Sequence, residues 1–322
     1  MSLLIDETRP FWLPALNEVA GRPTGGLHEW LRSGDFAVHH QVAQGGFRLH
    51  VPTPRPLVTA FAADLSRLSS ASLESSLEME RAAHSPKAAA WCLIRLYYAG
   101  FFAVHSILRA YGVSVSQLEY EQTKHVEDVA DAWQMLGTQS IPGGTYICAY
   151  SDTGKELSCS QARGGTGGAH EVVWEAFLKN ARTLGSHILS HGSTTRQRQT
   201  VVAKLEELDE NLCLQGRNAG NWLSYMRNQI TYRQAYGCWY PYKDGESRIG
   251  LLRVLDANIS DPMNVPLASL RQKPLQCFVG TLGFILGWQH SLLADMKARC
   301  PRGTSFITVG PFAYSTRMAG RR

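Results

Sequence analysis

The sequence lacks cysteine pairs at metal-binding or redox spacing, lacks a signal-peptide pattern and contains few charged residues. Its seven cysteines include no CxxC pair and no zinc-ribbon spacing, which is typical of reduced thiols, several of them in a core. Asp6 and Glu7 stand where a signal peptide needs basic residues, so we expect a cytoplasmic protein. Charged residues make up 18% of the chain, against roughly 25% in typical soluble domains. This composition excludes a disordered tail protein, a coiled coil and a collagen-like fibre.

Acidic residues are absent from two long stretches. None occurs between Glu210 and Asp244, and none between Met296 and Arg322, where six basic residues lie. The net charge is +5, and the chain outside this basic end is close to neutral. Any contact with nucleic acid must therefore use a local basic patch.

An uncharged stretch from Pro274 to Ala294 raises the question of a membrane span. It contains polar residues such as Gln289 and His290, and its dense apolar part, residues 275–288, is shorter than the about 20 residues that a span needs. We therefore expect a buried helix of a soluble protein and no membrane contact. A membrane-acting effector that uses this stretch is the other interpretation.

No motif for a metal, a nucleotide or a serine nucleophile is complete. His170-Glu171 begins a zinc-protease pattern, but Trp174 occupies the position of the second ligand. Gly154-Lys155 is followed by Glu156, where a P-loop needs Ser or Thr, and no GxSxG sequence occurs. The glycine-rich residues 163–168 precede a helical pattern and suit either a phosphate cradle or a surface loop. The sequence thus predicts no metal and no cofactor, although ligands from distant segments would leave no spacing to read.

The length of 322 residues and the 44% of apolar residues allow one large domain or two ordinary ones, at about 150 residues per domain. No internal repeat or clean linker divides the chain. The pattern predicts a mainly α protein with an irregular, β-containing N-terminal arm at 1–58, a helical domain at 59–300 and a basic tail at 301–322. The helical domain carries a Gly-rich insertion at about 137–168, which contains the β-prone residues 145–150 and is expected to be a hairpin-like insertion or a long loop.

Apolar spacing and flanking residues predict the helices. The most apolar one begins after Ser85-Pro86, runs from Lys87 to about Tyr111 and ends at Gly112, so we expect it at the centre of the fold. The Ser69–Ser72 run is a candidate break in the helix predicted over residues 57–81. The remaining predicted helices cover residues 57–81, 170–190, 200–214, 218–235 and one or two segments of 265–297.

Residues 218–242 combine basic and aromatic side chains without any acid. Guanidinium groups neutralise phosphates while aromatic faces stack on unpaired bases, so this composition favours RNA binding. On a helix, Arg227 to Thr231 and Asn228 to Tyr232 are i,i+4 pairs and form one polar cluster. The same residues would also suit helices that brace one another through hydrogen bonds. The basic and aromatic residues are Trp222, Tyr225, Arg227, Tyr232, Arg233, Tyr236, Trp239, Tyr240, Tyr242 and Lys243.

Two segments together resemble a known family. The first, Trp91–Gly112, reads WCLIRLYYAGFFAVHSILRAYG, and the second is Arg227-Asn228 followed by Tyr232. They resemble the early core helix of HEPN domains, with its Tyr-Tyr-Ala and Phe-rich sequence, and the Arg-polar-x(3 to 5)-His signature of a later HEPN helix. The resemblance covers about residues 88–240, interrupted by the insertion. It implies a homodimer in which both copies of the motif line one cleft. Many HEPN proteins are metal-independent ribonucleases of toxin–antitoxin and anti-phage systems, and others are non-catalytic RNA-binding or assembly modules.

The chain departs from the family at the catalytic histidine. That residue would fall where this chain has Tyr232, Arg233 and Gln234. Histidine suits the role of a base because its pKa lies near 6.5, whereas the pKa of tyrosine lies near 10. Either the site binds RNA without cleaving it, or Tyr232 and a partner residue replace the histidine. His105 on the core helix is a candidate for approaching the site in three dimensions, although a histidine on an apolar helix is usually a hydrogen-bonded core residue.

The resemblance and the residue pattern together give two expectations. The first is a HEPN-like RNA-acting protein, a metal-independent ribonuclease or toxin-type effector of bacterial anti-phage defence, which binds RNA, forms a homodimer and joins a defence complex. The alternative is a non-catalytic HEPN-like interaction subunit that assembles with a partner enzyme, with the aromatic segment 239–242 as its anchor. The predicted catalytic residues are Arg227, Asn228 and Tyr232, and the predicted RNA-binding residues are Arg227, Arg233, Tyr236 and Trp239.

Overall fold

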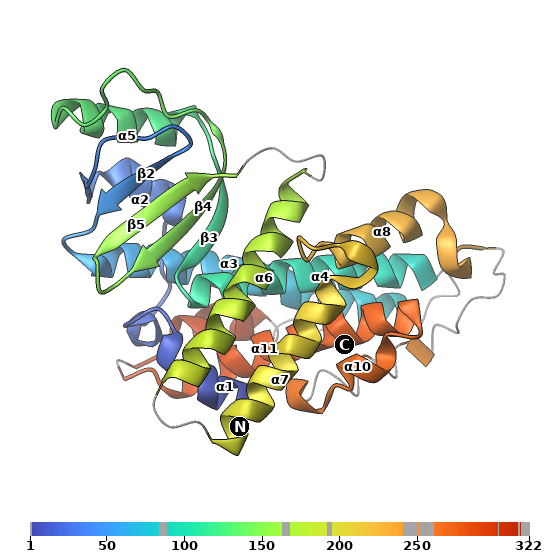
Figure 1. Ribbon diagram of the computed structural model, residues 1–322. Coiled ribbons are helices and arrows are strands. Elements are labelled where there is room, and N and C mark those ends of the chain that lie inside the picture. Colours follow the sequence, from blue (N-terminus) through green and yellow to red (C-terminus); the bar gives the residue numbers. More distant parts are fainter. Residues whose placement is uncertain are drawn as a thin grey trace.

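The computed structural model confirms a mainly helical protein with a small β component (Figure 1). Long helices form a bundle, and a five-stranded antiparallel sheet lies at one end of the molecule. The structure describes residues 2–83, 89–162, 168–191, 195–240, 250–251, 255, 261–301, 303–314 and 316. The Ser85-Pro86 helix start, residues 163–167 of the glycine-rich segment, and Tyr242 and Lys243 fall outside this range, as do several basic residues of the C-terminal tail.

Helix α4 (Ala89–Ala110) is the centre of the bundle, as its apolar sequence predicts. It packs between α3 (Pro54–Ala83) and α11 (Pro274–Ala298). Gly100 permits the close approach of α11, because a Cβ atom at this position would overlap Cδ2 of Leu282. Gly112, with φ of +73°, turns the chain out of the helix, which confirms its predicted role as a terminator.

The predicted break at Ser69–Ser72 is wrong, because α3 continues through these residues. The helix accommodates Ser69 and Ser72 because their hydroxyl groups form hydrogen bonds with core residues. Ser72 Oγ donates to the carbonyl of Ala99 and to Oε1 of Gln289, and Ser69 Oγ donates to Oγ of Ser106. Gln289 Nε2 also donates to Ser106, so this polar network joins α3, α4 and α11. Burial with satisfied hydrogen bonds makes the serines part of the helix packing.

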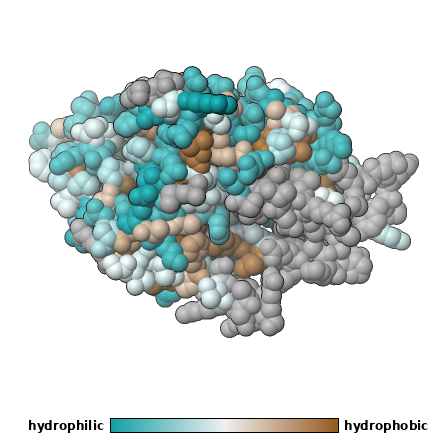
Figure 2. Space-filling view, turned by 90° about the horizontal axis from the view of Figure 1, so that it is seen from below, coloured by the Kyte–Doolittle hydropathy of each residue, from teal (hydrophilic) through white to brown (hydrophobic). Residues whose placement is uncertain are grey.

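Among the described residues, two helices, α4 and α11, are long and apolar enough to cross a membrane by length and composition. In the folded chain, 61% of the 18-residue apolar segment of α4 and 83% of that of α11 are buried inside the protein. Their apolar surfaces are therefore largely covered by the other elements of the bundle. On the face drawn in Figure 2, hydrophobic residues form small patches among hydrophilic ones.

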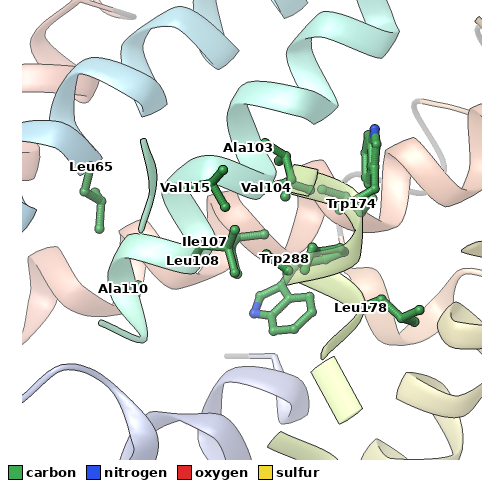
Figure 3. Packing of buried hydrophobic residues seen from close by; sticks show 14 of the residues in the cluster. Leu65, Ala103, Val104, Ile107, Leu108, Ala110, Val115, Trp174, Leu178 and Trp288 are labelled. Atoms are coloured by element: carbon green, nitrogen blue, oxygen red, sulfur yellow. The ribbon is translucent and has the colours of Figure 1, made fainter. Parts of the chain in front are cut away.

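The other long helices cover the central three and close the core. They match the predicted helices with shifts at their ends. Figure 3 shows Val104 and Ile107 of α4, Trp174 and Leu178 of α6, and Trp288 of α11 converging in this core. The remaining bundle helices in the described part of the chain are α1 (Leu3–Thr8), α6 (Gly168–Ser190), α7 (Arg196–Leu212), α8 (Trp222–Arg233) and α10 (Leu267–Leu270). Of these, α1 lies in the arm that the sequence predicted to be irregular.

The sheet joins the N-terminal arm to the Gly-rich insertion. Its strand order is β1-β2-β5-β4-β3, and every neighbouring pair is antiparallel. The predicted hairpin is present as β4 (Gly144–Ser151) and β5 (Glu156–Gln161). The arm supplies β1 (Ala37–Val38) and β2 (Gly46–His50), and β3 (Val113–Leu118) follows directly after α4. Helices α2 (Leu27–Ser33) and α5 (Tyr120–Ala132), which the sequence did not predict, pack beside the sheet.

Candidate functional site

Helix α8 divides the predicted polar cluster between two directions. The Arg227 guanidinium lies over the ring of Tyr97 on α4, 5.3 Å from its centroid. Asn228 is exposed, and Tyr232, one turn later on the same face, has an exposed fraction of 73%. Because neighbouring helical residues point about 100° apart, Arg227 faces the bundle while Asn228 and Tyr232 face outward. The structure therefore does not bring Tyr232 into the surroundings of Arg227.

The surroundings of Arg227 are built on the hydroxyl group of Tyr97. Tyr97 is fully buried, and its Oη lies 2.9 Å from Nδ1 of His170 at the start of α6. Trp174, one turn further along α6, donates from Nε1 to the same oxygen over 3.1 Å. The ring of Phe101 stacks on His170 with centroids 4.3 Å apart, which holds the imidazole in place. Tyr97 thus links α4, α6 and α8 at one point.

Burial and charge tune the two titratable groups of this cluster. Burial raises the pKa of Tyr97, while hydrogen bonds from Trp174 and Ser224 and the charge of Arg227 act in the other direction. Burial, followed by the charge of Arg227, lowers the pKa of His170 below its usual value of 6.5. His170 is consequently a neutral imidazole at neutral pH. We name the group of Tyr97, His170 and Arg227 the RHY cluster.

The RHY cluster combines three functions that chemistry on phosphates requires. A guanidinium group binds phosphate oxygens, a neutral imidazole accepts or donates a proton near neutral pH, and a buried hydroxyl group orients the imidazole. The Tyr97 hydroxyl engages Nδ1 of His170, which leaves Nε2 as the nitrogen available to another partner. Among the described residues, two buried polar atoms of this side of α8 have no hydrogen-bond partner, Nε of Arg227 and Oγ1 of Thr231. Unsatisfied buried donors are rare in folded proteins, and a bound ligand is one way in which they are satisfied.

The other predicted site residues lie at the end of α8 and beyond it. Tyr236 donates its hydroxyl to the sulfur of Met226, and Trp239 donates from Nε1 to the carbonyl of Ile230 over 2.7 Å. Trp239 also meets Trp91 of α4 edge to face, with centroids 5.3 Å apart. These contacts tie the segment after α8 to the bundle. Arg233 is exposed near Tyr232, away from these contacts.

His105 belongs to a neighbouring environment on α4. Its Nδ1 lies 3.2 Å from Nη1 of Arg109. Its ring centroid lies 4.8 Å from that of Phe101, which is one helical turn from Tyr97 of the RHY cluster. Burial, Arg109 and His170 lower the pKa of His105 well below 6.5. Because a guanidinium only donates, Nδ1 of His105 is the acceptor and the ring is neutral.

Sequence reasoning missed Tyr97 and His170 as site residues. Tyr97 belongs to the Tyr-Tyr-Ala sequence that carries the family resemblance, but its hydroxyl leaves no sign in an apolar pattern. His170 stood out only as part of an incomplete zinc-protease motif. In the structure Glu171 accepts a hydrogen bond from Nδ2 of Asn221 over 2.8 Å, and Trp174 fills the core. The motif therefore has a structural explanation, and His170 is brought to Arg227 by the packing of α6 against α4 and α8.

Comparison of the chain with models of protein families, with curated proteins and with solved structures found no match in any of the three.

Proposed function

We propose that the protein is a HEPN-like RNA-acting protein that cleaves RNA without a metal ion, with the RHY cluster as its active site. The observation that carries this proposal is that the Arg227 guanidinium and His170 both contact Tyr97, while burial and the charge of Arg227 lower the pKa of His170 and keep it neutral. A histidine thus stands beside the motif arginine, although it comes from α6 and not from the motif helix. In this respect the geometry supplies the residue type that α8 lacks.

The proposed reaction follows from the roles of the three side chains. His170 removes the proton of a ribose 2′-hydroxyl group, which then attacks the neighbouring phosphorus, and Arg227 stabilises the negative charge that develops on the phosphate oxygens. Tyr97 holds His170 in orientation through Nδ1. The bond from phosphorus to the 5′-oxygen breaks, the leaving oxygen takes a proton from water, and the protonated His170 releases its proton to water. The products are RNA with a cyclic 2′,3′-phosphate end and RNA with a 5′-hydroxyl end.

Exposed residues of α8 fit a role in holding the RNA strand. Tyr232 presents an exposed ring, and Arg233 an exposed guanidinium, at the end of the helix that carries Arg227. Aromatic rings stack on unpaired bases of any sequence, and each stacked base contributes about 1–3 kcal/mol. Tyr232 is therefore proposed as a base-stacking residue in place of the catalytic role expected from its position. Homodimer formation and a toxin-type role in anti-phage defence belong to the same proposal and rest on the family resemblance.

The test is an RNA-cleavage assay with purified protein, a single-stranded RNA substrate and EDTA. Arg227→Ala and His170→Asn are each expected to lower the cleavage rate by at least about 100-fold, the typical effect of losing one transition-state contact. Arg196→Ala is the matched control, because Arg196 is an exposed arginine at the start of α7. Cleavage that requires magnesium, or that is unchanged in Arg227→Ala, would contradict the proposed mechanism.

Exposed aromatic residues favour the second candidate, a non-catalytic interaction subunit. Trp91 is 53% exposed and Tyr240 81% exposed, and Trp239 packs against Trp91. Large aromatic side chains are frequent anchors of protein interfaces. Wild-type protein that neither binds nor cleaves RNA, together with a partner enzyme whose binding is lost in Trp91→Ala, would favour this candidate over the first.

A further inference from the structure

Strand register places two histidines, an arginine and a glutamate on the solvent face of the sheet, at the end opposite to α8 (Figure 1). Glu156, the first residue of β5, is paired with His50, the last residue of β2. His39 follows β1, and its backbone N–H donates to the carbonyl of Arg48 on β2. Since side chains on paired residues project to the same face, His39, Arg48, His50 and Glu156 share the face that the core does not cover.

The side chains of His39, His40 and Glu156 converge there. Nδ1 of His39 lies 2.6 Å from Oε2 of Glu156, and the imidazoles of His39 and His40 have centroids 4.2 Å apart. One nitrogen of each histidine and one carboxylate oxygen lie within 4.8 Å of one another. Two ligand atoms of a tetrahedral zinc ion lie about 3.4 Å apart, between the shortest and the longest separation in this group, so the exposed imidazoles need only a small rotation to bind an ion.

The surroundings of this triad suit an ion with an open coordination position. Oε1 of Glu156 faces Arg48 at 3.8 Å, which leaves Oε2 as the oxygen for a metal. A hollow of about 540 Å³, lined by His40, Arg48, Phe47 and Ser158 among others, opens beside the triad and leaves room for water. Two imidazoles and one carboxylate are the ligand set of catalytic zinc sites and of other open sites for borderline transition metals.

We propose that His39, His40 and Glu156 bind a divalent transition-metal ion of the Zn²⁺ type, with water in the remaining position. The ion joins the residues after β1, a two-residue strand at the edge of the sheet, to β5 across β2. Binding to the folded state alone stabilises that state, so the ion holds the edge of the sheet in place. This site is separate from the RHY cluster, and the proposal does not depend on RNA cleavage.

The test is a zinc titration of untagged, EDTA-treated and desalted full-length protein by calorimetry, with Co²⁺ absorption as a second readout. Wild-type protein is expected to bind one equivalent, to show the visible bands of Co²⁺ with nitrogen and oxygen ligands, and to melt a few degrees higher with Zn²⁺. His40→Ala and Glu156→Gln are expected to weaken binding by about 100-fold or more, because loss of even an outer-shell partner costs about 10- to 100-fold. His39 and His40 are exposed, so their replacement leaves the core intact.

Two variants separate this site from unspecific binding. The double variant His187→Ala/His191→Ala removes an exposed histidine pair near Phe11 at the end of α6, and it is expected to bind Zn²⁺ as the wild type does. Arg48→Gln removes the cation that competes for Glu156 and is expected to retain or strengthen binding. Unchanged zinc affinity in both His40→Ala and Glu156→Gln, or loss of binding in the His187/His191 variant, would overturn the proposal.

Discussion

The hydroxyl group of Tyr97 lies 2.9 Å from Nδ1 of His170, although 73 positions separate the two residues in the chain. The same oxygen accepts a hydrogen bond from Trp174, and the Arg227 guanidinium lies over the Tyr97 ring. A fully buried core residue thus holds a half-buried histidine in position. The core packing and the chemistry of the RHY cluster depend on one another.

Tyr97→Phe tests the role of the Tyr97 hydroxyl group directly. The substitution removes the oxygen that Trp174 and His170 share, and it leaves the indole N–H unpaired in the core. Leaving a buried donor unsatisfied costs about 1–3 kcal/mol, so we expect the free energy of unfolding to fall by this amount in urea denaturation. The matched control is Tyr98→Phe at the next, half-buried position, with an expected change within about 0.5 kcal/mol. Equal effects of the two substitutions would contradict the role of the Tyr97 hydroxyl.

The histidines predict how stability depends on pH. The pKa values of His105, His170 and His290 are lowered by burial, so the unfolded chain takes up protons near pH 6.5 while the folded chain does not. Stability is then complete above about pH 6.5 and falls as the pH drops from there toward the folded-state pKa values. We expect urea midpoints to decrease between pH 7.5 and 5, and His105→Asn to reduce this decrease. An unchanged pH dependence in His105→Asn, with exposed His187→Asn as the reference, would contradict the assignment.

Two helical glycines are expected to respond to alanine in opposite directions. At Gly100 of α4 a Cβ atom would overlap Leu282 of α11, and overpacking of a core typically costs about 1–3 kcal/mol. At Gly185 of α6 nothing lies within 4 Å of the added Cβ, so alanine should stabilise the helix by about 0.5–1 kcal/mol. Thermal and urea unfolding of the two single variants give the signs. Stabilisation by Gly100→Ala would show that α4 and α11 are not as close as described.

The buried network around Gln289 predicts a non-additive response. Gln289→Leu keeps the volume but leaves Ser106 without its amide donor, and we expect a loss of about 1–3 kcal/mol in the free energy of unfolding. Replacing Ser72 and Ser106 by alanine in the same protein also removes the two hydroxyl groups that have lost Gln289 as a partner. The triple variant should therefore lose less stability than the sum of the single variants. A strictly additive result would indicate that the groups do not interact.

The long helices of the bundle were predictable because each of them buries one continuous segment. Helix α4 is apolar on almost every side and ends next to Gly112, so its central place followed from its own residues. The sheet was not predictable as a unit, because β2 and β5 come from distant segments and only their pairing creates the apolar face. The helix break predicted at Ser69–Ser72 was wrong for a related reason, because the partners of these hydroxyl groups lie on other helices and cannot be identified from the sequence.

The candidate site was partly visible in the sequence. Arg227 stood out because the residues around it are basic and aromatic without any acid. The direction of each side chain was not visible: Asn228 and Tyr232 form the outward face of α8, whereas Arg227 lies against α4. His170 could not be connected with Arg227 from the sequence, because the approach of α6 to α8 is a result of packing around Tyr97. The grouping of His39, His40 and Glu156 could not be predicted from the sequence either, because strand pairing brings their segments together.

The pairing of β2 with β5 has a consequence for synthesis of the protein. Gly46 of β2 pairs with Ser160 of β5, so the two strands leave the ribosome far apart in time. Until β5 has been made, β2 is a strand without its inner neighbour, and α3 and α4 are complete before the sheet can form. Nascent chains that stop before residue 161 would expose this strand to pairing with other chains, which is a known route to aggregation. The sheet thus closes only after half of the chain has been translated, and the bundle is completed later still, when α11 follows.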